Sequence, residues 1–159
     1  MIRLRSPFLW ILACTILIQT LAGQQPPEQK HKMTLQLLET PLSICRLGPN
    51  MAIPDWAAGN GEFLSITRTA DELSIICSDT AAPREAKCER GWRALKIAGP
   101  LDFSLTGVLT SVAAPLAEAG VSIFAVSTYD TDYVLVRAEN LDKATRTLSK
   151  AGHTVKRDY

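Results

Sequence analysis

Two short polar segments in the second half of this 159-residue chain have the residue types of a small-molecule site. The first, residues 99–107 (GPLDFSLTG), runs into an apolar helical pattern, and the unpaired amides at a helix N-terminus attract anions such as a carboxylate. The second, residues 129–132 (YDTD), is a turn whose aspartates could bind an ammonium group through charge-assisted hydrogen bonds. A structural role is equally open, because Asp102, Ser104 or Thr106 could cap the helix and aspartates favour turns.

Catalysis and metal binding have little support in the sequence. Asp130 and Asp132 form an Asp-x-Asp pair, but no further carboxylate or histidine lies nearby to complete a metal site. A histidine base would have to be His153, because the other histidine, His31, lies in a polar linker. The chain contains no Gly-x-Ser-x-Gly, P-loop or His-Glu-x-x-His pattern. We therefore expect no catalytic residue, no metal and no cofactor.

Three cysteines, Cys45, Cys77 and Cys88, lie outside the apolar N-terminal stretch. An odd number without Cys-x-x-Cys spacing matches neither a disulfide framework nor a zinc site. Free cysteine in a strand usually packs as a small apolar residue, so we expect all three to be reduced and buried. A secreted protein would instead pair two of them and leave one free. None has an activating neighbour in the sequence, so none is expected as a nucleophile.

The leader, residues 1–32, differs in composition from the rest of the chain. Arg3 and Arg5 precede an uncharged stretch, residues 6–27, whose apolar centre is typical of a secretory signal. Two explanations stay open: the leader exports or anchors the domain, or it is an upstream extension before a true start at Met33. Without it the chain carries 13 basic and 15 acidic side chains, which form no basic face for nucleic acid. We expect the protein to be cytoplasmic. It would be exported or would touch a membrane only if the leader is functional.

The first half of the domain shows strand patterns separated by turn residues. Residues 34–39 predict a short strand, and the Gly- and Pro-rich residues 45–61 predict a loop with one helical turn near Trp56. Residues 63–67 and 73–77 alternate and predict a hairpin with a four-residue connection. This half therefore consists of strands and loops and has no clear long helix.

The second half alternates strands with two amphipathic helices. Apolar residues at helical spacing run from Leu105 to Ala119, and a second helix follows Asn140, which offers an N-cap. Within the first helix Pro115 removes the amide that would bond the Ser111 carbonyl. Strands are expected around these helices, over residues 92–97, 121–127, 133–136 and 153–156. The order strand, helix, strand, strand, helix, strand predicts an antiparallel sheet with both helices on one face, the ferredoxin-like α+β plan.

The second half resembles a known family. Residues 106–123 (TGVLTSVAAPLAEAGVSI) resemble the first helix and second strand of ACT domains, the amino-acid-binding regulatory modules of aspartate kinases and other biosynthetic enzymes. Residues 127–136 (STYDTDYVLV) narrow the resemblance to the subgroup of aspartate kinase regulatory domains and Castor-type arginine sensors, which includes small proteins of two ACT-like halves. The resemblance implies a degenerate N-terminal ACT-like half over residues 33–91 and a C-terminal ACT domain over residues 92–157.

The resemblance also implies a function and a set of binding residues. It implies a non-catalytic regulatory protein that binds an amino acid, and a homodimer formed through sheet edges. Asp132 falls on the aspartate with which the arginine sensors contact their ligand. The residues expected at the ligand are Asp102, Phe103, Ser104, Thr106, Gly107, Asp130, Thr131 and Asp132. The alternative is a dimerising interaction module whose ligand site is vestigial.

Overall fold

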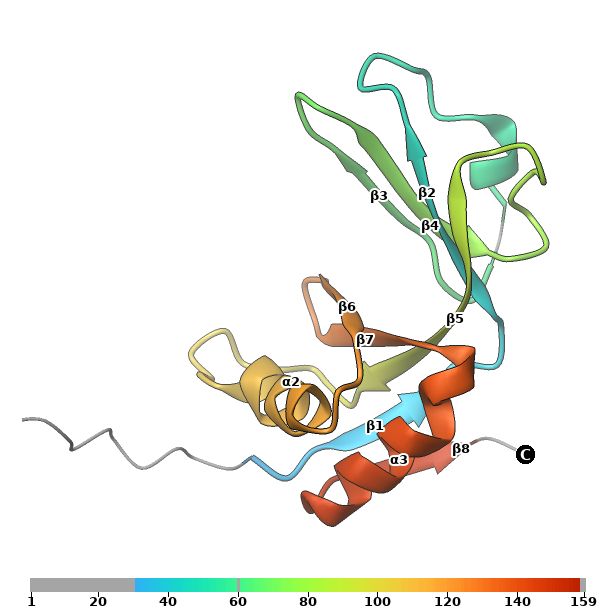
Figure 1. The fold of residues 1–159 in the computed structure, drawn as a ribbon. Coiled ribbons are helices and arrows are strands. Elements are labelled where there is room, and N and C mark those ends of the chain that lie inside the picture. Colours follow the sequence, from blue (N-terminus) through green and yellow to red (C-terminus); the bar gives the residue numbers. More distant parts are fainter. Residues whose placement is uncertain (1–30, 60, 158–159) are drawn as a thin grey trace, which may run out of the picture.

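The computed structural model describes residues 31–59 and 61–157 (Figure 1), so the signal and extension alternatives for the leader fall outside the described residues. Five strands come first: β1 (Thr34–Leu37), β2 (Leu42–Leu47), β3 (Ser65–Arg68), β4 (Leu73–Ser78) and β5 (Cys88–Ile97). The later elements are α2 (Val108–Glu118), β6 (Ile123–Ser127), β7 (Asp132–Arg137), α3 (Leu141–Lys150) and β8 (Thr154–Arg157). Two short 3-10 turns are η2 (Asp55–Ala57) and η3 (Ala138–Asn140).

The described strands form one mixed sheet, in which β5 is shared by both parts of the domain. Hydrogen bonds connect the strands in the order β3-β4-β2-β5-β1-β8, and β7 pairs with β5 and β6. Against β2, the register of β5 shifts between Leu42 and Ile44, where Gly91 has a positive φ of 74°. Such a bulge bends and twists a strand. Figure 1 shows β5 passing from the layer of β2, β3 and β4 into the layer that carries the helices.

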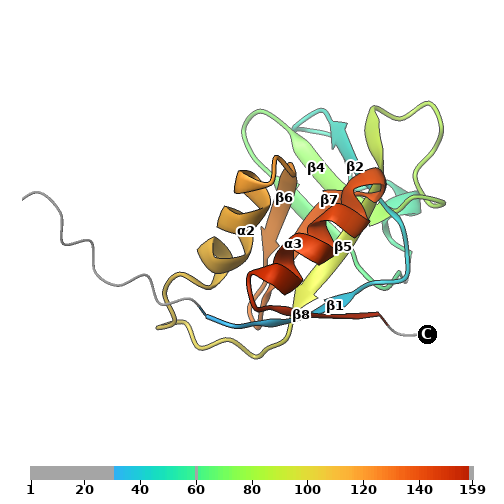
Figure 2. The same ribbon diagram turned by 60° about the horizontal axis from the view of Figure 1, so that its bottom comes forward.

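The helices α2 and α3 lie side by side on one face of the sheet formed by β6, β7, β5, β1 and β8 (Figure 2). Side chains alternate along a strand, so every second residue faces the helices. The buried cluster between the two layers contains Leu35, Leu37, Leu95, Ile97, Val112, Leu116, Val134, Val136, Ala144 and Leu148. The predicted ferredoxin-like α+β fold is confirmed, but the sheet is not wholly antiparallel as expected, because β1 and β8 pair in parallel. Neither helix of the described chain is long and apolar enough to cross a bilayer.

A second buried cluster lies where the two parts of the domain meet. Trp92 and Ala94 of β5 face away from Leu95, as strand alternation requires, and pack with Leu135 of β7. Phe63 and Ile76 of the first part pack against the same cluster. The two parts of the domain therefore share a core as well as a strand.

The predicted elements of the first part are found, but one predicted boundary in each part of the domain was wrong. The β3–β4 hairpin has the predicted four-residue connection, and Trp56 lies in η2. The loop prediction from residue 45 was wrong, because β2 continues to Leu47 and pairs with both β4 and β5. The helix predicted from Leu105 begins only at Val108, and Leu105 is 46% exposed in the turn that precedes it.

The expectation that all three cysteines are reduced was wrong. Cys45 of β2 and Cys88 of β5 form a disulfide, with the sulfur atoms 2.01 Å apart. The two residues are opposite each other in the β2–β5 register although 43 residues separate them in sequence. Cys77 of β4 is free and buried. The structure therefore has the other arrangement considered from the sequence, one pair and one free thiol.

Candidate functional site

The structure brings the two polar segments of the second half together beside the N-terminus of α2. Five residues from the start of α2 and the loop before it, together with residues 127–132, line a hollow of about 230 Å³; the five are Leu101, Asp102, Phe103, Leu105 and Val108. The predicted binding residues that line it are Asp102, Phe103, Asp130, Thr131 and Asp132. The other three, Ser104, Thr106 and Gly107, belong to the same loop but do not line this hollow.

Backbone contacts hold the loop against the β6–β7 turn. The Leu101 amide donates to the Asp130 carbonyl oxygen over 2.8 Å. A Cβ on Gly99 would lie 2.7 Å from that same oxygen, so this close approach requires glycine. The spacing between the two walls of the hollow is therefore fixed by the backbone, as a site with defined ligand geometry requires.

Two threonines organise the β6–β7 turn. Thr128 donates from its amide and its Oγ1 to the Thr131 carbonyl, over 2.8 and 2.7 Å. The buried hydroxyl of Thr131 donates to the Ile97 carbonyl over 2.5 Å, which attaches the turn to β5. The carboxylates of Asp130 and Asp132 take part in none of the ion pairs found among the described residues. They are the groups of this turn that can meet a cationic ligand.

Asp102 organises the loop in front of α2. Its Oδ1 accepts hydrogen bonds from the Ser104 hydroxyl over 2.6 Å and from the Ser104 amide over 2.8 Å. Both bonds favour the charged form, the hydroxyl bond most, so the pKa of Asp102 lies below its ordinary value. Capping of α2 by Asp102, Ser104 or Thr106 is contradicted, because its N-cap is Gly107 and no side chain accepts there. The first amides of α2 thus have no side-chain cap among the described residues and can meet an anion.

The hollow includes a tyrosine that the sequence analysis did not select as a binding residue. The Tyr129 ring meets the Phe103 ring edge to face, with centroids 5.2 Å apart. Both rings are highly exposed, at 81% for Tyr129 and 77% for Phe103. Exposed aromatic rings at the edge of a hollow can cover the aliphatic part of a ligand. The available signal was the position of Tyr129 within the same turn as the two aspartates.

A second hollow, of about 310 Å³, adjoins the same turn and was also missed. It shares Thr128, Asp130 and Thr131 with the first hollow. The rest of its lining consists of Lys96, Gly99, Pro100 and Tyr133. The signal in the sequence was the alternation of β5, which places Lys96 on the face opposite Leu95.

The histidine and the free cysteine considered for catalysis both lie in the core. The Nδ1 of buried His153 accepts from the Met33 amide over 3.1 Å, so its Nε2 donates to the Ser111 carbonyl, 2.9 Å away. Burial raises the pKa of the Cys77 thiol, which disfavours the reactive thiolate. The part of the chain that the structure describes contains no group of three or more His, Cys, Asp or Glu side chains placed to hold a metal ion.

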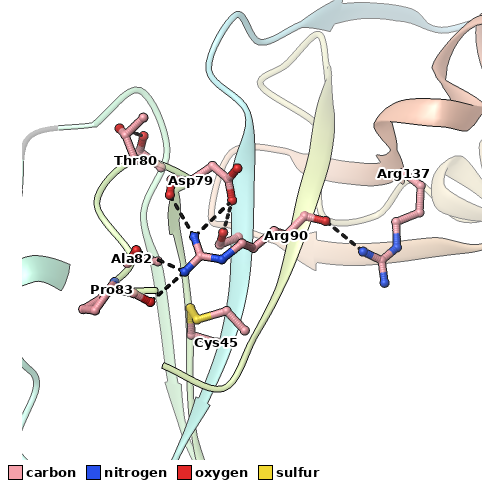
Figure 3. A network of polar contacts seen from close by, with 10 residues as sticks. Cys45, Asp79, Thr80, Ala82, Pro83, Arg90 and Arg137 are labelled. Carbon is pink, nitrogen blue, oxygen red and sulfur yellow. Dashed lines mark hydrogen bonds and ion pairs between the residues drawn. A yellow bond between two sulfur atoms is a disulfide. The ribbon is translucent and has the colours of Figure 1, made fainter. Parts of the chain in front are cut away.

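A polar network around Arg90 holds the loop after β4 onto β5 (Figure 3). The guanidinium donates to the carbonyl oxygens of Ala82 and Pro83 over 3.2 and 2.6 Å. It also donates to the Asp79 carbonyl over 3.0 Å and lies 3.6 Å from the Asp79 carboxylate. The Arg90 carbonyl in turn accepts from Arg137 over 2.8 Å. These contacts engage the guanidinium with the chain itself, so we assign the network to the fold.

Family profiles match both parts of the chain. A profile described as ACT domain matches residues 87–150, and another, described as an N-terminal domain, matches residues 42–85. A protein from Agobacterium tumefaciens, whose crystal structure is known, is 42% identical in sequence to this chain. The match covers 81% of this chain and 96% of the Agobacterium chain, with a TM-score of 0.77. Human cytosolic arginine sensor for mTORC1 subunit 1 is 31% identical over 56% of this chain and 30% of the sensor. Synechocystis aspartate kinase shares the fold at 17% identity and a TM-score of 0.55, over 83% of this chain and 28% of the kinase.

Residues 87–150 of this chain form an ACT domain, as the profile match over these residues shows. The predicted resemblance to aspartate kinase regulatory domains and Castor-type arginine sensors is confirmed. The chain spans less than two thirds of the curated relatives that it matches, 62% of a human Castor-named protein and 30% of the human arginine sensor. The activities and partners of those longer proteins do not follow from the match alone.

Proposed function

We propose that this chain is a regulatory protein that binds a free amino acid in the hollow between residues 99–107 and the β6–β7 turn. The observation that carries the proposal is the pair of opposite chemistries around one hollow. The loop ends at the uncapped amides of α2, and the turn carries the carboxylates of Asp130 and Asp132. An amino acid needs such a pair for its carboxylate and its ammonium group. The relative named as an arginine sensor supports an amino acid as the ligand class.

The proposal includes two ACT-like halves, residues 33–91 and residues 92–157, of which the first is degenerate. Separate profile matches over residues 42–85 and 87–150 support this division. A non-catalytic role is supported by His153, whose two ring nitrogens are engaged by backbone groups. In this proposal ligand binding is sensed through the shared strand β5 and the sheet.

A thermal-shift screen of the full chain against the proteinogenic amino acids tests the proposal. A ligand at 100 times its Kd stabilises a fold by about 2.7 kcal/mol, which raises the Tm of a domain of this size by several degrees. We expect one amino acid, or a chemically related few, to raise the Tm, and Asp132→Asn to abolish the shift. The matched control is Asp71→Asn, an exposed carboxylate in the β3–β4 connection, which should keep it. Absence of any shift, with no binding heat in calorimetry, would contradict the proposal.

A dimerising module is the second candidate, favoured by the open edge of β6. Among the described strands β6 pairs with β7 alone, and Phe124 on β6 is 37% exposed. Unpaired strand edges are templates for pairing with a second chain. Size-exclusion chromatography with light scattering, with and without amino acids, separates the two functions. A dimer that forms without ligand, is lost in Ala125→Pro and shows no thermal shift would support the dimerising module. A monomer under all conditions would contradict it.

We also propose a cytoplasmic location. The relatives named as cytosolic arginine sensors support it, whereas disulfides such as Cys45–Cys88 are commoner in oxidising compartments. Cell fractionation followed by mass spectrometry under non-reducing conditions measures both properties. Recovery from the cytoplasmic fraction is the expected result. Recovery from an exported fraction with the leader removed would contradict the proposed location.

A further inference from the structure

Lys96 differs from the other described lysines in its burial. It is half-buried in β5, whereas the other described lysines are exposed: Lys32, Lys87, Lys143, Lys150 and Lys156. Lys96 takes part in none of the ion pairs of the described residues, and its Nζ lies 5.9 Å from the centroid of the Tyr133 ring. An ammonium without a carboxylate partner gains a charge-assisted hydrogen bond when an anion binds beside it.

The position of Lys96 links it to the proposed amino-acid site. Lys96 is paired with Tyr133 in the β5–β7 register, and strand alternation places both on the sheet face opposite the helices. Both residues line the second hollow, which shares Thr128, Asp130 and Thr131 with the first. Asp130 therefore borders both hollows, and a ligand bound to its carboxylate lies beside the second hollow.

We propose that the ligand is a dicarboxylic amino acid whose second carboxylate binds the Lys96 ammonium; this inference rests on the proposed amino-acid-binding function. The first carboxylate meets the amides at the start of α2, the ammonium group meets Asp130, and the side-chain carboxylate lies in the second hollow. Its bond to Lys96 is charge-assisted, the stronger kind of hydrogen bond. A cationic side chain in that hollow would face a like charge, which disfavours it as a ligand.

Isothermal titration calorimetry of the full chain tests the role of Lys96. The ligands are aspartate and glutamate, their neutral analogues asparagine and glutamine, and arginine. We expect one acid to bind wild type about tenfold or more tightly than its amide. In Lys96→Met the affinity for the acid should fall about tenfold or more, while the affinity for the amide stays unchanged. Methionine keeps an apolar stem beside Tyr133, and thermal melting checks that the variant folds.

Two further variants complete the experiment. Lys156→Met, an exposed lysine of β8, should bind like wild type, and Lys96→Arg should keep the preference for the acid because it keeps the charge. Equal affinity for acid and amide, unchanged binding in Lys96→Met, or binding of arginine alone would overturn the assignment and leave the amino-acid site standing. If no amino acid binds wild type, the proposed function fails, and the role of Lys96 fails with it.

Discussion

Replacing His153 perturbs two backbone contacts that tie α2 to the start of β1. Pro115 has no N–H, so the Ser111 carbonyl lacks its helical donor, and His153 Nε2 donates to it over 2.9 Å. On the other side of the ring, Nδ1 accepts from the Met33 amide over 3.1 Å. The imidazole therefore provides the partner that the proline removes, and it fixes the chain segment that enters the sheet.

We expect His153→Ala to lower the free energy of unfolding by about 2–3 kcal/mol. Each of the two part-buried hydrogen bonds contributes about 1 kcal/mol, and loss of the ring's apolar contacts adds to this. Pro115→Ala supplies an amide that can bond the Ser111 carbonyl within the helix. In the double variant about 1 kcal/mol of the loss should therefore be recovered, which is a coupling energy measurable by a double-mutant cycle.

Urea unfolding of wild type, both single variants and the double variant, followed by circular dichroism, measures this coupling. The m-values must agree among the four proteins for the free energies to be compared. In a control cycle His153→Ala is replaced by Lys156→Ala, an exposed residue of β8, and the coupling should lie within about 0.3 kcal/mol of zero. Additive effects of His153→Ala and Pro115→Ala would refute the argument that the imidazole substitutes for the missing helical donor.

Three other perturbations have defined outcomes. Gly99→Ala should destabilise the fold by about 1–3 kcal/mol in urea unfolding, because its Cβ would lie 2.7 Å from a carbonyl oxygen of the β6–β7 turn. Gly59→Ala, with nothing within 4 Å of the new Cβ, is the matched control, and an equal effect of both variants would contradict the argument. Iodoacetamide should alkylate Cys77 at least about tenfold more slowly in the native chain than in urea, because burial raises the pKa of its thiol. Equal alkylation rates in the two states, measured by peptide mass spectrometry, would disprove this. The hydrogen bond and charge of Arg157 lower the pKa of Asp142. The ion pair therefore stabilises the fold fully at pH values above the ordinary aspartate pKa of about 4. This stabilisation is lost as the pH falls through the lowered pKa of Asp142. The Tm difference between wild type and Asp142→Asn should therefore be present at neutral pH and vanish near about pH 2, and a pH-independent difference would contradict the ion-pair argument.

The candidate site could be predicted in part, because its two segments carry local signals. Residues 99–107 join a strand to a helix, and residues 129–132 form a turn between two strands, so both could be selected before their contact was known. Lys96 was missed because it reaches the turn from β5. Tyr129 belongs to the turn and was missed because its ring contact with Phe103 forms only in the tertiary structure. The alternative in which Asp102 caps α2 was wrong, since its carboxylate bonds Ser104 within the loop.

The sequence by itself determined the periodic elements of the second half and hence the ferredoxin-like α+β plan. Strand alternation, helical apolar stripes and turn residues act over a few positions, so they can be recognised locally. Only the tertiary structure decided which distant groups meet. It placed β1 between β5 and β8, put Cys45 opposite Cys88, and brought His153 to Met33 across 120 residues. Such pairings depend on sheet register and on the packing of whole elements, for which no local pattern in the chain is sufficient.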